Sequence, residues 1–270
     1  MSSPHFSVII PAANEEHFVH RAIRSVRAQE VPAEIIVAVN GSRDKTADEA
    51  RAEGARVVEF SELLGASRAR NEGARIATGE MLVFLDADST LGPRTLATTE
   101  RRVGAWSFGT VRGRPDNKKV RYKLFFLWKN TLHRFGLFHG VLGGLLFFDA
   151  ALFREIGGFD DSLKVNEFAD IIARARHAGG RYRYIRSCTA ETSMRRFERQ
   201  GFVRSLLFWT AVWLAGRGSK LGARYVSSHD ELFESMYEIA GDMARSLGLR
   251  GEESTPALAR EETPEPARLP

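Results

Sequence analysis

Short apolar runs alternate with amphipathic stretches through the first 90 positions of the chain. The runs are rich in β-branched residues and stop at turn-forming residues, which is typical of buried strands; they cover residues 6–10, 34–39, 56–60 and 81–85. Apolar residues recur at helical spacing between them, which predicts helices over 14–26, 44–55 and 66–77. Alternation of this kind predicts an α/β fold with a doubly wound, mostly parallel central sheet and flanking helices.

The second half of the chain continues with a less regular pattern. It predicts strands over 106–112, 142–148 and 181–186, helices over 167–179 and 202–215, and an aromatic amphipathic segment over 122–138. Residues 250–270 are rich in Glu, Pro and Ala and poor in bulky apolar groups, so we expect a disordered tail. The predicted organisation is one domain over 1–200, divided into halves at 1–90 and 91–200, and a C-terminal helical extension over 201–249.

Composition restricts the class of protein. With 270 residues, 43% of them hydrophobic, the chain is long enough for one large domain. A net charge of +5 suits an anionic ligand such as a nucleotide, or an anionic membrane surface. The basic residues are spread along the chain and form no nucleic-acid-binding motif, so we expect no nucleic-acid partner.

The number of cysteines and the lengths of the apolar runs indicate the cellular compartment of the protein. Cys188 is the single cysteine, which excludes an intrachain disulfide and fits a reducing compartment. No basic segment followed by an apolar run opens the sequence, and no run reaches the ~20 apolar residues of a spanning helix. We therefore expect a cytoplasmic protein, with the inner face of the membrane as an alternative location.

Polar clusters follow three of the predicted strands, at 11–15, 40–44 and 86–88. The carboxyl ends of parallel strands meet at one edge of a sheet, so these clusters should gather there. Asp86 and Asp88 supply two carboxylates one residue apart, the kind of hard oxygen ligand that holds Mg²⁺ or Mn²⁺ against a diphosphate. A solvated acidic turn is the alternative, and the position directly after an apolar strand favours the metal site.

Four segments in order resemble one family. They are SVIIPAANE at 7–15, NGSRDKT at 40–46, GASRARNEG at 65–73 and GEMLVFLDAD at 79–88. Each is weak singly, whereas the ordered set is specific. Over about residues 6–200 the chain resembles family 2 glycosyltransferases, which have the GT-A fold.

The resemblance implies roles for individual residues of the first half. The expected base and ribose pocket consists of Pro11, Ala12, Glu15 and Asn40, and the expected nucleotide and metal contacts are Arg70, Asp86 and Asp88. The family often has Asp-Asp where this chain has Val39-Asn40. Because Asn40 is neutral, it leaves the preferred base open. We expect a UDP-sugar first and a GDP-sugar second.

The acceptor half departs from the family at one position. Residues 153–160 (FREIGGFD) resemble the family's F-x-x-I-G-G-F-D segment, and the EFAD sequence at 167–170 stands where E-D-x-D usually stands. The second acid, which acts as the general base in relatives, is replaced by Phe168. Glu167 is therefore the candidate base, with Asp170 as the second choice. Arg195 and Arg196 are expected to neutralise the leaving diphosphate or to hold an anionic acceptor.

The aromatic segment over 122–138 suggests a further partner. Lysines and arginines alternate there with Phe and Trp side chains, a mixture that suits an amphipathic helix on an anionic membrane. Burial in the core or a homodimer contact would also explain it. The expected acceptor is a sugar or a lipid-linked group.

We therefore predict a metal-dependent inverting glycosyltransferase. A nucleotidyltransferase would carry a Gly-rich, Lys-containing loop after the first strand, and 11–15 lacks one. A non-catalytic nucleotide-sugar-binding protein is a second alternative, favoured by Phe168 in place of the usual acid. A Rossmann dehydrogenase lacks its G-x-G-x-x-G signature here.

Overall fold

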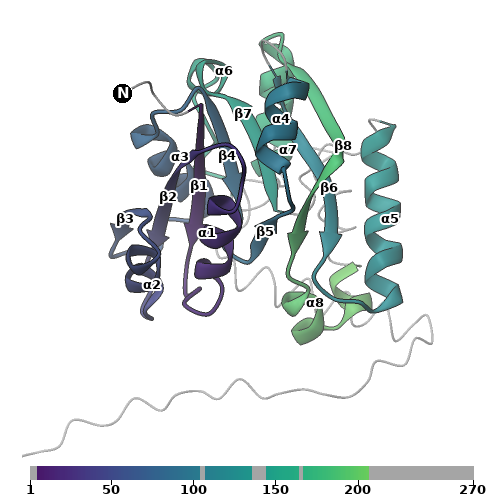
Figure 1. The fold of residues 1–270 in the computed structure, drawn as a ribbon, viewed down its shortest axis with the longest axis horizontal. Coiled ribbons are helices and arrows are strands. Elements are labelled where there is room, and N and C mark those ends of the chain that lie inside the picture. The colour runs from purple at the N-terminus through teal and green to yellow at the C-terminus, as the bar shows by residue number, and fades with distance from the viewer. Residues whose placement is uncertain (1–4, 104–106, 136–143, 164–166, 207–270) are drawn as a thin grey trace, which may run out of the picture.

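A computed structural model describes residues 5–103, 107–135, 144–163 and 167–206. Eight strands form one sheet in the order β3-β2-β1-β4-β7-β6-β8-β5 (Figure 1). The strands are β1 (Phe6–Ala12), β2 (Ala33–Asn40), β3 (Arg56–Phe60), β4 (Met81–Leu85), β5 (Ser89–Leu91), β6 (Ser107–Pro115), β7 (Leu145–Asp149) and β8 (Arg181–Thr192). The predicted tail and the extension beyond Leu206 lie outside the described residues.

Helices cover both faces of the sheet. They are α1 (Val19–Arg27), α2 (Thr46–Ala52), α3 (Ala66–Ile76), α4 (Thr95–Val103), α5 (Val120–Arg134), α6 (Ala150–Glu155), α7 (Glu167–His177) and α8 (Arg195–Gln200). Side chains of a strand alternate between faces. Val8 of β1 packs in one core with α1 and α2, whereas Ile9 packs in another with α3, α6 and α7. The predicted doubly wound arrangement is confirmed.

The sheet changes character at β4. From β3 to β4 all neighbouring strands are parallel. Beyond β4, β7 runs antiparallel to both β4 and β6, β8 is parallel to β6, and β5 is antiparallel to β8. β6 and β8 approach so closely that a Cβ at Gly109 would lie 1.8 Å from the carbonyl oxygen of Arg183, which requires glycine there.

The first helix starts later than its sequence pattern suggests. Asn14 was the expected start, but it takes a φ of +54°, a left-handed conformation that cannot open a helix. The helix α1 begins at Val19 instead. The polar residues 14–16 are thereby left as a turn at the carboxyl end of β1, where they can meet a ligand.

The aromatic segment forms α5, which lies along the outside of the fold next to β6 (Figure 1). Its inner face belongs to a third apolar cluster, formed by Tyr122, Phe125, Phe126 and Met194, with Phe197, Phe202 and Leu206 packed against it. Among the described residues, no helix combines the length and apolar character needed to cross a membrane.

Candidate functional site

The turns after β1 and β2 are joined by reciprocal hydrogen bonds. The backbone N–H of Asn14 donates to Ser42 Oγ (3.0 Å), and the N–H of Arg43 donates to Asn14 Oδ1 (2.9 Å). The N–H of Glu15 donates to Thr46 Oγ1 (2.7 Å). Two of the sequence motifs are thus one structural unit, which fixes the backbone of Glu15 at the edge of the sheet.

The predicted base pocket lies at the ends of β1 and β2. Pro11 and Ala12 close β1, and Asn40 closes β2 with only 4% of its surface exposed. Asn40 Oδ1 accepts a hydrogen bond from the N–H of Leu64 at 2.6 Å. Asn40 therefore anchors the loop between β3 and α3. Recognition of a base by these residues stays a prediction.

Arg70 joins the two halves of the site. Its side chain is almost fully buried; Nη2 donates to Asp86 Oδ1 at 3.0 Å, and Nη1 donates to Glu167 Oε1 at 3.3 Å. The guanidinium also lies over the rings of Phe168 and Phe159, 4.5 and 5.5 Å from their centroids. Such stacking suits a planar cation. The first aspartate of the D-x-D triplet and the candidate base thus share one partner.

A second arginine, Arg195, contacts the carboxylates of Glu15 and Asp88. Arg195 pairs with Glu15, and its Nε lies 3.4 Å from Asp88 Oδ2. Its guanidinium stacks over the ring of Phe18, 4.2 Å from the centroid. The second oxygen of Glu15 is buried without a hydrogen-bond partner among the described residues. Arg196, the other predicted arginine, is exposed, although its charge still acts on Asp88.

The electrostatics around Asp88 favour a cation. Burial and the neighbouring charge of Asp86 raise the pKa of Asp88 to about 6, against the opposing effect of Arg195. A divalent cation would stabilise the ionised form of this carboxylate. Within the described residues, no three His, Cys, Asp or Glu side chains group as a metal site. The pair Asp86 and Asp88 fits a cation that takes its other ligands from a diphosphate and water, as Mg²⁺ commonly does.

The two acids of α7 have different partners. Asp170 Oδ2 accepts two hydrogen bonds from Arg174, at 2.6 and 2.8 Å, and Arg174 also donates to the carbonyl of Ile156. The Asp170 carboxylate therefore helps to hold α7 against the end of α6. Glu167 is the α7 acid that reaches the site through Arg70.

Asn71 is a positioning residue beside this cluster. Its Nδ2 donates to the carbonyl of Phe159 and to Asp161 Oδ1, and its Oδ1 accepts from the N–H of Phe159. A Cβ at Gly158, where φ is +70°, would lie 2.6 Å from Asn71 Oδ1. Asn71 thus fixes the loop that carries Phe159 beneath Arg70.

Sequence reasoning missed several contacts that shape the site. It assigned no role to Phe18, the ring beneath Arg195, or to Thr46, which binds the Glu15 backbone. A signal for Thr46 was present, since it closes the NGSRDKT motif. Phe168 was noted only as a missing acid, whereas its ring supports Arg70.

The fold is similar to that of solved GT-A glycosyltransferases. The mannosyltransferase PcManGT of Pyrobaculum calidifontis, in complex with GDP-Man and Mn²⁺, matches with a TM-score of 0.62 and 20% identity, over 91% of this chain and 76% of its own. Staphylococcus aureus TarS 1-349, in complex with UDP-GlcNAc, matches with a TM-score of 0.56 and 15% identity, over 89% and 72%. These likenesses establish the fold.

The family follows from the sequence of the first half. Residues 7–139, just under half of the chain, match the model for glycosyl transferase family 2, and this match confirms the resemblance predicted from the sequence. The succinoglycan biosynthesis protein ExoU of Rhizobium meliloti is 29% identical over 204 residues, 67% of this chain and 59% of that protein. The 4,4'-diaponeurosporenoate glycosyltransferase of Staphylococcus aureus is 38% identical over 89 residues, 31% of this chain and 24% of that protein. The chain thus covers less than two thirds of either relative.

Proposed function

We propose that the protein is a metal-dependent inverting glycosyltransferase, which moves a sugar from a nucleotide-sugar to an acceptor hydroxyl. The contact that carries the proposal is the bridge made by Arg70. This one buried guanidinium holds Asp86 of the D-x-D triplet and Glu167 of the acceptor half. Diphosphate binding and proton removal would therefore occur within one small volume, as group transfer requires.

Each charged side chain has a proposed task. Asp86 and Asp88 would hold Mg²⁺ or Mn²⁺, which neutralises charge on the leaving diphosphate when bound. Arg195, released from Glu15 and Asp88, would donate to the diphosphate oxygens. Glu167 would accept the proton of the acceptor hydroxyl as it attacks the anomeric carbon from the face opposite the diphosphate, which inverts the anomeric configuration.

The donor and acceptor classes are proposed from the comparisons. The solved neighbours carry GDP-Man in one case and UDP-GlcNAc in another, so both predicted bases have precedent in this fold. We favour a UDP-sugar, with a GDP-sugar second. The relatives named for succinoglycan and diaponeurosporenoate support a sugar or lipid-linked acceptor. The proposed place of the reaction is the cytoplasm, with the inner face of the membrane as the alternative. Homodimerisation stays an untested alternative for the apolar surfaces.

The test is a donor panel. The protein is incubated with Mn²⁺, each of a set of UDP- and GDP-sugars, and sugar or lipid-linked acceptors, and nucleoside diphosphate release is measured with and without a chelator. We expect release that the chelator abolishes, and a product with inverted anomeric configuration by NMR. Pyrophosphate release from a nucleoside triphosphate and a sugar phosphate would instead show a nucleotidyltransferase. Donor binding without turnover across all acceptors would show a non-catalytic binding protein.

A further inference from the structure

The outward face of α5 is apolar although it meets solvent. Of the seven large apolar side chains that are exposed in the described part of the chain, five lie on α5 or at its C-cap: Val120, Leu124, Leu127, Trp128 and Phe135. Val120, Leu124, Leu127 and Phe135 follow one another at spacings that form a single stripe along a helix. Leu127 and Trp128 are 61% and 52% exposed. A continuous stripe of exposed apolar side chains indicates a surface that binds another protein or a membrane.

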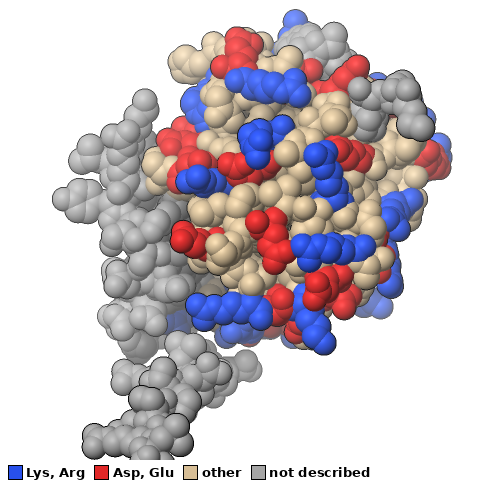
Figure 2. All heavy atoms as spheres, turned by 90° about the vertical axis from the view of Figure 1, so that its left-hand side faces the viewer, with Lys and Arg blue, Asp and Glu red and all other residues tan. Residues whose placement is uncertain are grey.

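The charged side chains of the segment that carries the stripe are all basic. Between residues 117 and 135 the sequence has no Asp or Glu, and its basic residues outside the core-facing side are Lys118, Lys119, Arg121, Lys123 and Arg134. The side of the molecule opposite α5 differs, because acidic and basic side chains are interspersed there (Figure 2). Ion pairs such as Arg51–Glu59 and Arg24–Glu53 belong to that side. Lys119 pairs with Glu198 at 2.9 Å, whereas Lys118, Arg121, Lys123 and Arg134 form no ion pair with an acid in the described part of the chain. The α5 side therefore has an excess of positive charge.

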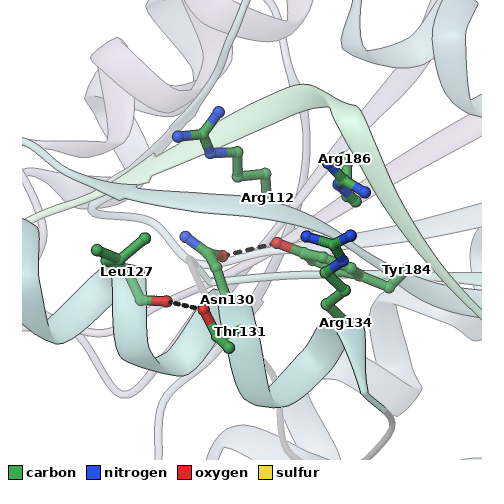
Figure 3. A pocket seen from close by; sticks show the side chains of 7 residues that line it. All are labelled: Arg112, Leu127, Asn130, Thr131, Arg134, Tyr184 and Arg186. Carbon is green, nitrogen blue, oxygen red and sulfur yellow. Dashed lines mark hydrogen bonds between the residues drawn. The ribbon is translucent and has the colours of Figure 1, made fainter.

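A polar pocket opens beside the stripe, between α5 and the strands β6 and β8 (Figure 3). It has a volume of about 250 Å³ and is lined by Arg112, Leu127, Asn130, Thr131, Arg134, Tyr184 and Arg186. The three arginines come from three different elements, and no carboxylate lines the pocket. Among the described residues, none of the three forms an ion pair with an acid. The pocket thus concentrates positive charge that the protein itself does not neutralise.

The floor of the pocket is held by neutral groups. Tyr184 Oη donates to Asn130 Oδ1 (2.9 Å), and Asn130 Nδ2 donates to the carbonyl of Gly113 (3.0 Å). Burial raises the pKa of Tyr184 to about 12, more than Arg112 and Arg186 lower it. The phenol therefore stays protonated at neutral pH and adds no negative charge. A bound anion would be the counter-charge for the arginines.

We propose that the apolar stripe of α5 and the arginine pocket together form a docking surface for a membrane that contains anionic phospholipids. Leu127 and Thr131 of α5 line the pocket, and Leu127 also belongs to the stripe, so the two parts are continuous. The pocket would receive a headgroup phosphate, which guanidinium groups bind well, while the stripe enters the acyl boundary. Charge complementarity singles out an anionic membrane over a second copy of this chain, whose α5 would present the same positive charge.

The experiment is sedimentation of the full chain with vesicles, at low salt and without nucleotide. Vesicles of phosphatidylcholine are compared with vesicles that also contain phosphatidylglycerol. The variant Arg134→Gln with Arg186→Gln removes two pocket charges, and the variant Leu124→Gln with Leu127→Gln removes part of the stripe. The control, Arg21→Gln with Arg51→Gln, removes two exposed arginines from α1 and α2. Circular dichroism and donor hydrolysis in solution report on the fold and on the catalytic site separately.

We expect the wild type and the control to bind anionic vesicles and to bind neutral ones weakly. Each Lys or Arg near an anionic surface contributes about 1 kcal/mol, so the pocket variant should bind at least about tenfold more weakly. The stripe variant should also bind more weakly. Its remaining binding depends on the arginines, so added salt should weaken it more than it weakens binding of the wild type. Equal binding by the pocket variant and the control would overturn the proposal. So would saturation of the pocket by inorganic phosphate in a wild type that does not bind vesicles, because that result identifies a free anion site.

Because vesicle binding is measured without donor, its outcome is independent of the proposed transfer reaction. A protein that binds vesicles but releases no nucleoside diphosphate would retain this inference and lose the proposed function. A protein that hydrolyses donor but does not bind anionic vesicles would retain the proposed function and overturn this inference. Concentration-dependent self-association that the stripe variant abolishes, without vesicle binding, would assign the stripe to a dimer and overturn the membrane assignment.

Discussion

At the scale of single residues, Arg70 is the side chain that makes one site out of distant sequence. It lies 16 positions from Asp86 and 97 from Glu167, and contacts both. A buried guanidinium loses its hydration, so it must be satisfied by acceptors and ring faces in fixed places. Asp86 and Glu167 accept from the two terminal nitrogens and Phe159 and Phe168 lie against the guanidinium plane, whereas Nε is buried without a hydrogen-bond partner among the described residues. The same contacts hold Glu167 beside Asp86, where the proposed reaction would need a base.

The first prediction separates the two acids of α7. Glu167→Gln keeps the shape of the side chain and its acceptor for Arg70 but cannot take a proton, so transfer should fall by about 10²- to 10⁴-fold. The binding of nucleoside diphosphate should persist. Turnover and calorimetric titration of the same preparation provide both values.

Asp170→Asn is the matched control for Glu167→Gln. The Asp170 carboxylate is held by Arg174, away from Arg70, so transfer should change only a few-fold. A variant at Asp170 that loses as much activity as Glu167→Gln would move the base to Asp170.

A contact between two side chains could be predicted from the sequence only where the two residues lie close together along the chain. The ion pair of Asp170 with Arg174 spans one helical turn, so the spacing of the two residues along the chain is enough to predict it. The partners of Arg70 are brought to it by the sheet and by α7, and no local pattern encodes them. The motif resemblance named Arg70 as a nucleotide contact, whereas its observed partners are two acids and two rings.

At the scale of elements, boundaries were predictable where turn-forming residues end an apolar run. The limits of β3 and β4 agree with those expected from the sequence alone. The start of α1 did not, because Asn14 bonds across to Ser42 and Arg43 in place of capping a helix. Asn is favoured both at a helix N-cap and in a turn, and the hydrogen bonds with Ser42 and Arg43 favour the turn here. The antiparallel insertion of β7 depends on long-range pairing and has no local signal.

The second prediction concerns Glu34 of β2, which ties three elements together at the edge of the sheet far from the site. Burial alone would raise its pKa, but hydrogen bonds from Ser7 Oγ, from Thr78 and from Arg56 outweigh that effect and lower the pKa below 4.5. The ionised carboxylate therefore stabilises the fold above the ordinary pKa. This contribution is lost as the pH falls through the lowered pKa.

Glu34→Gln should accordingly cost about 1–3 kcal/mol of unfolding free energy at pH 7 and less at pH 3. Urea titrations of the variant and the wild type at both pH values give the difference. Glu62→Gln, at an exposed position after β3, is the control and should change stability by less than about 0.5 kcal/mol at either pH. The same loss at pH 3 as at pH 7 would show that the carboxylate charge plays no part.

At the scale of the whole molecule, the parallel half and the mixed half meet at charged contacts. Arg195 of α8 reaches Glu15, 180 positions earlier, as well as Asp88 after β4. Asp88 is also proposed to bind the divalent cation. The two halves are therefore joined by the same side chain that is proposed to bind the leaving diphosphate.

The last prediction tests that double role by comparing neighbouring arginines. A charge-assisted hydrogen bond contributes about 1.5–3 kcal/mol. Arg195 must break its pairs with Glu15 and Asp88 before it can bind the diphosphate, and this reduces the net gain. Arg195→Gln should therefore weaken the binding of nucleoside diphosphate with Mn²⁺ by about tenfold. Arg196→Gln removes the same charge from an exposed position and should weaken it less than about threefold. Calorimetric titration measures both dissociation constants. Because Arg195 also joins the halves, its loss should lower the ligand-free melting temperature, whereas Arg196→Gln should leave it unchanged. Equal effects of the two variants on binding would mean that Arg195 acts only through its net charge.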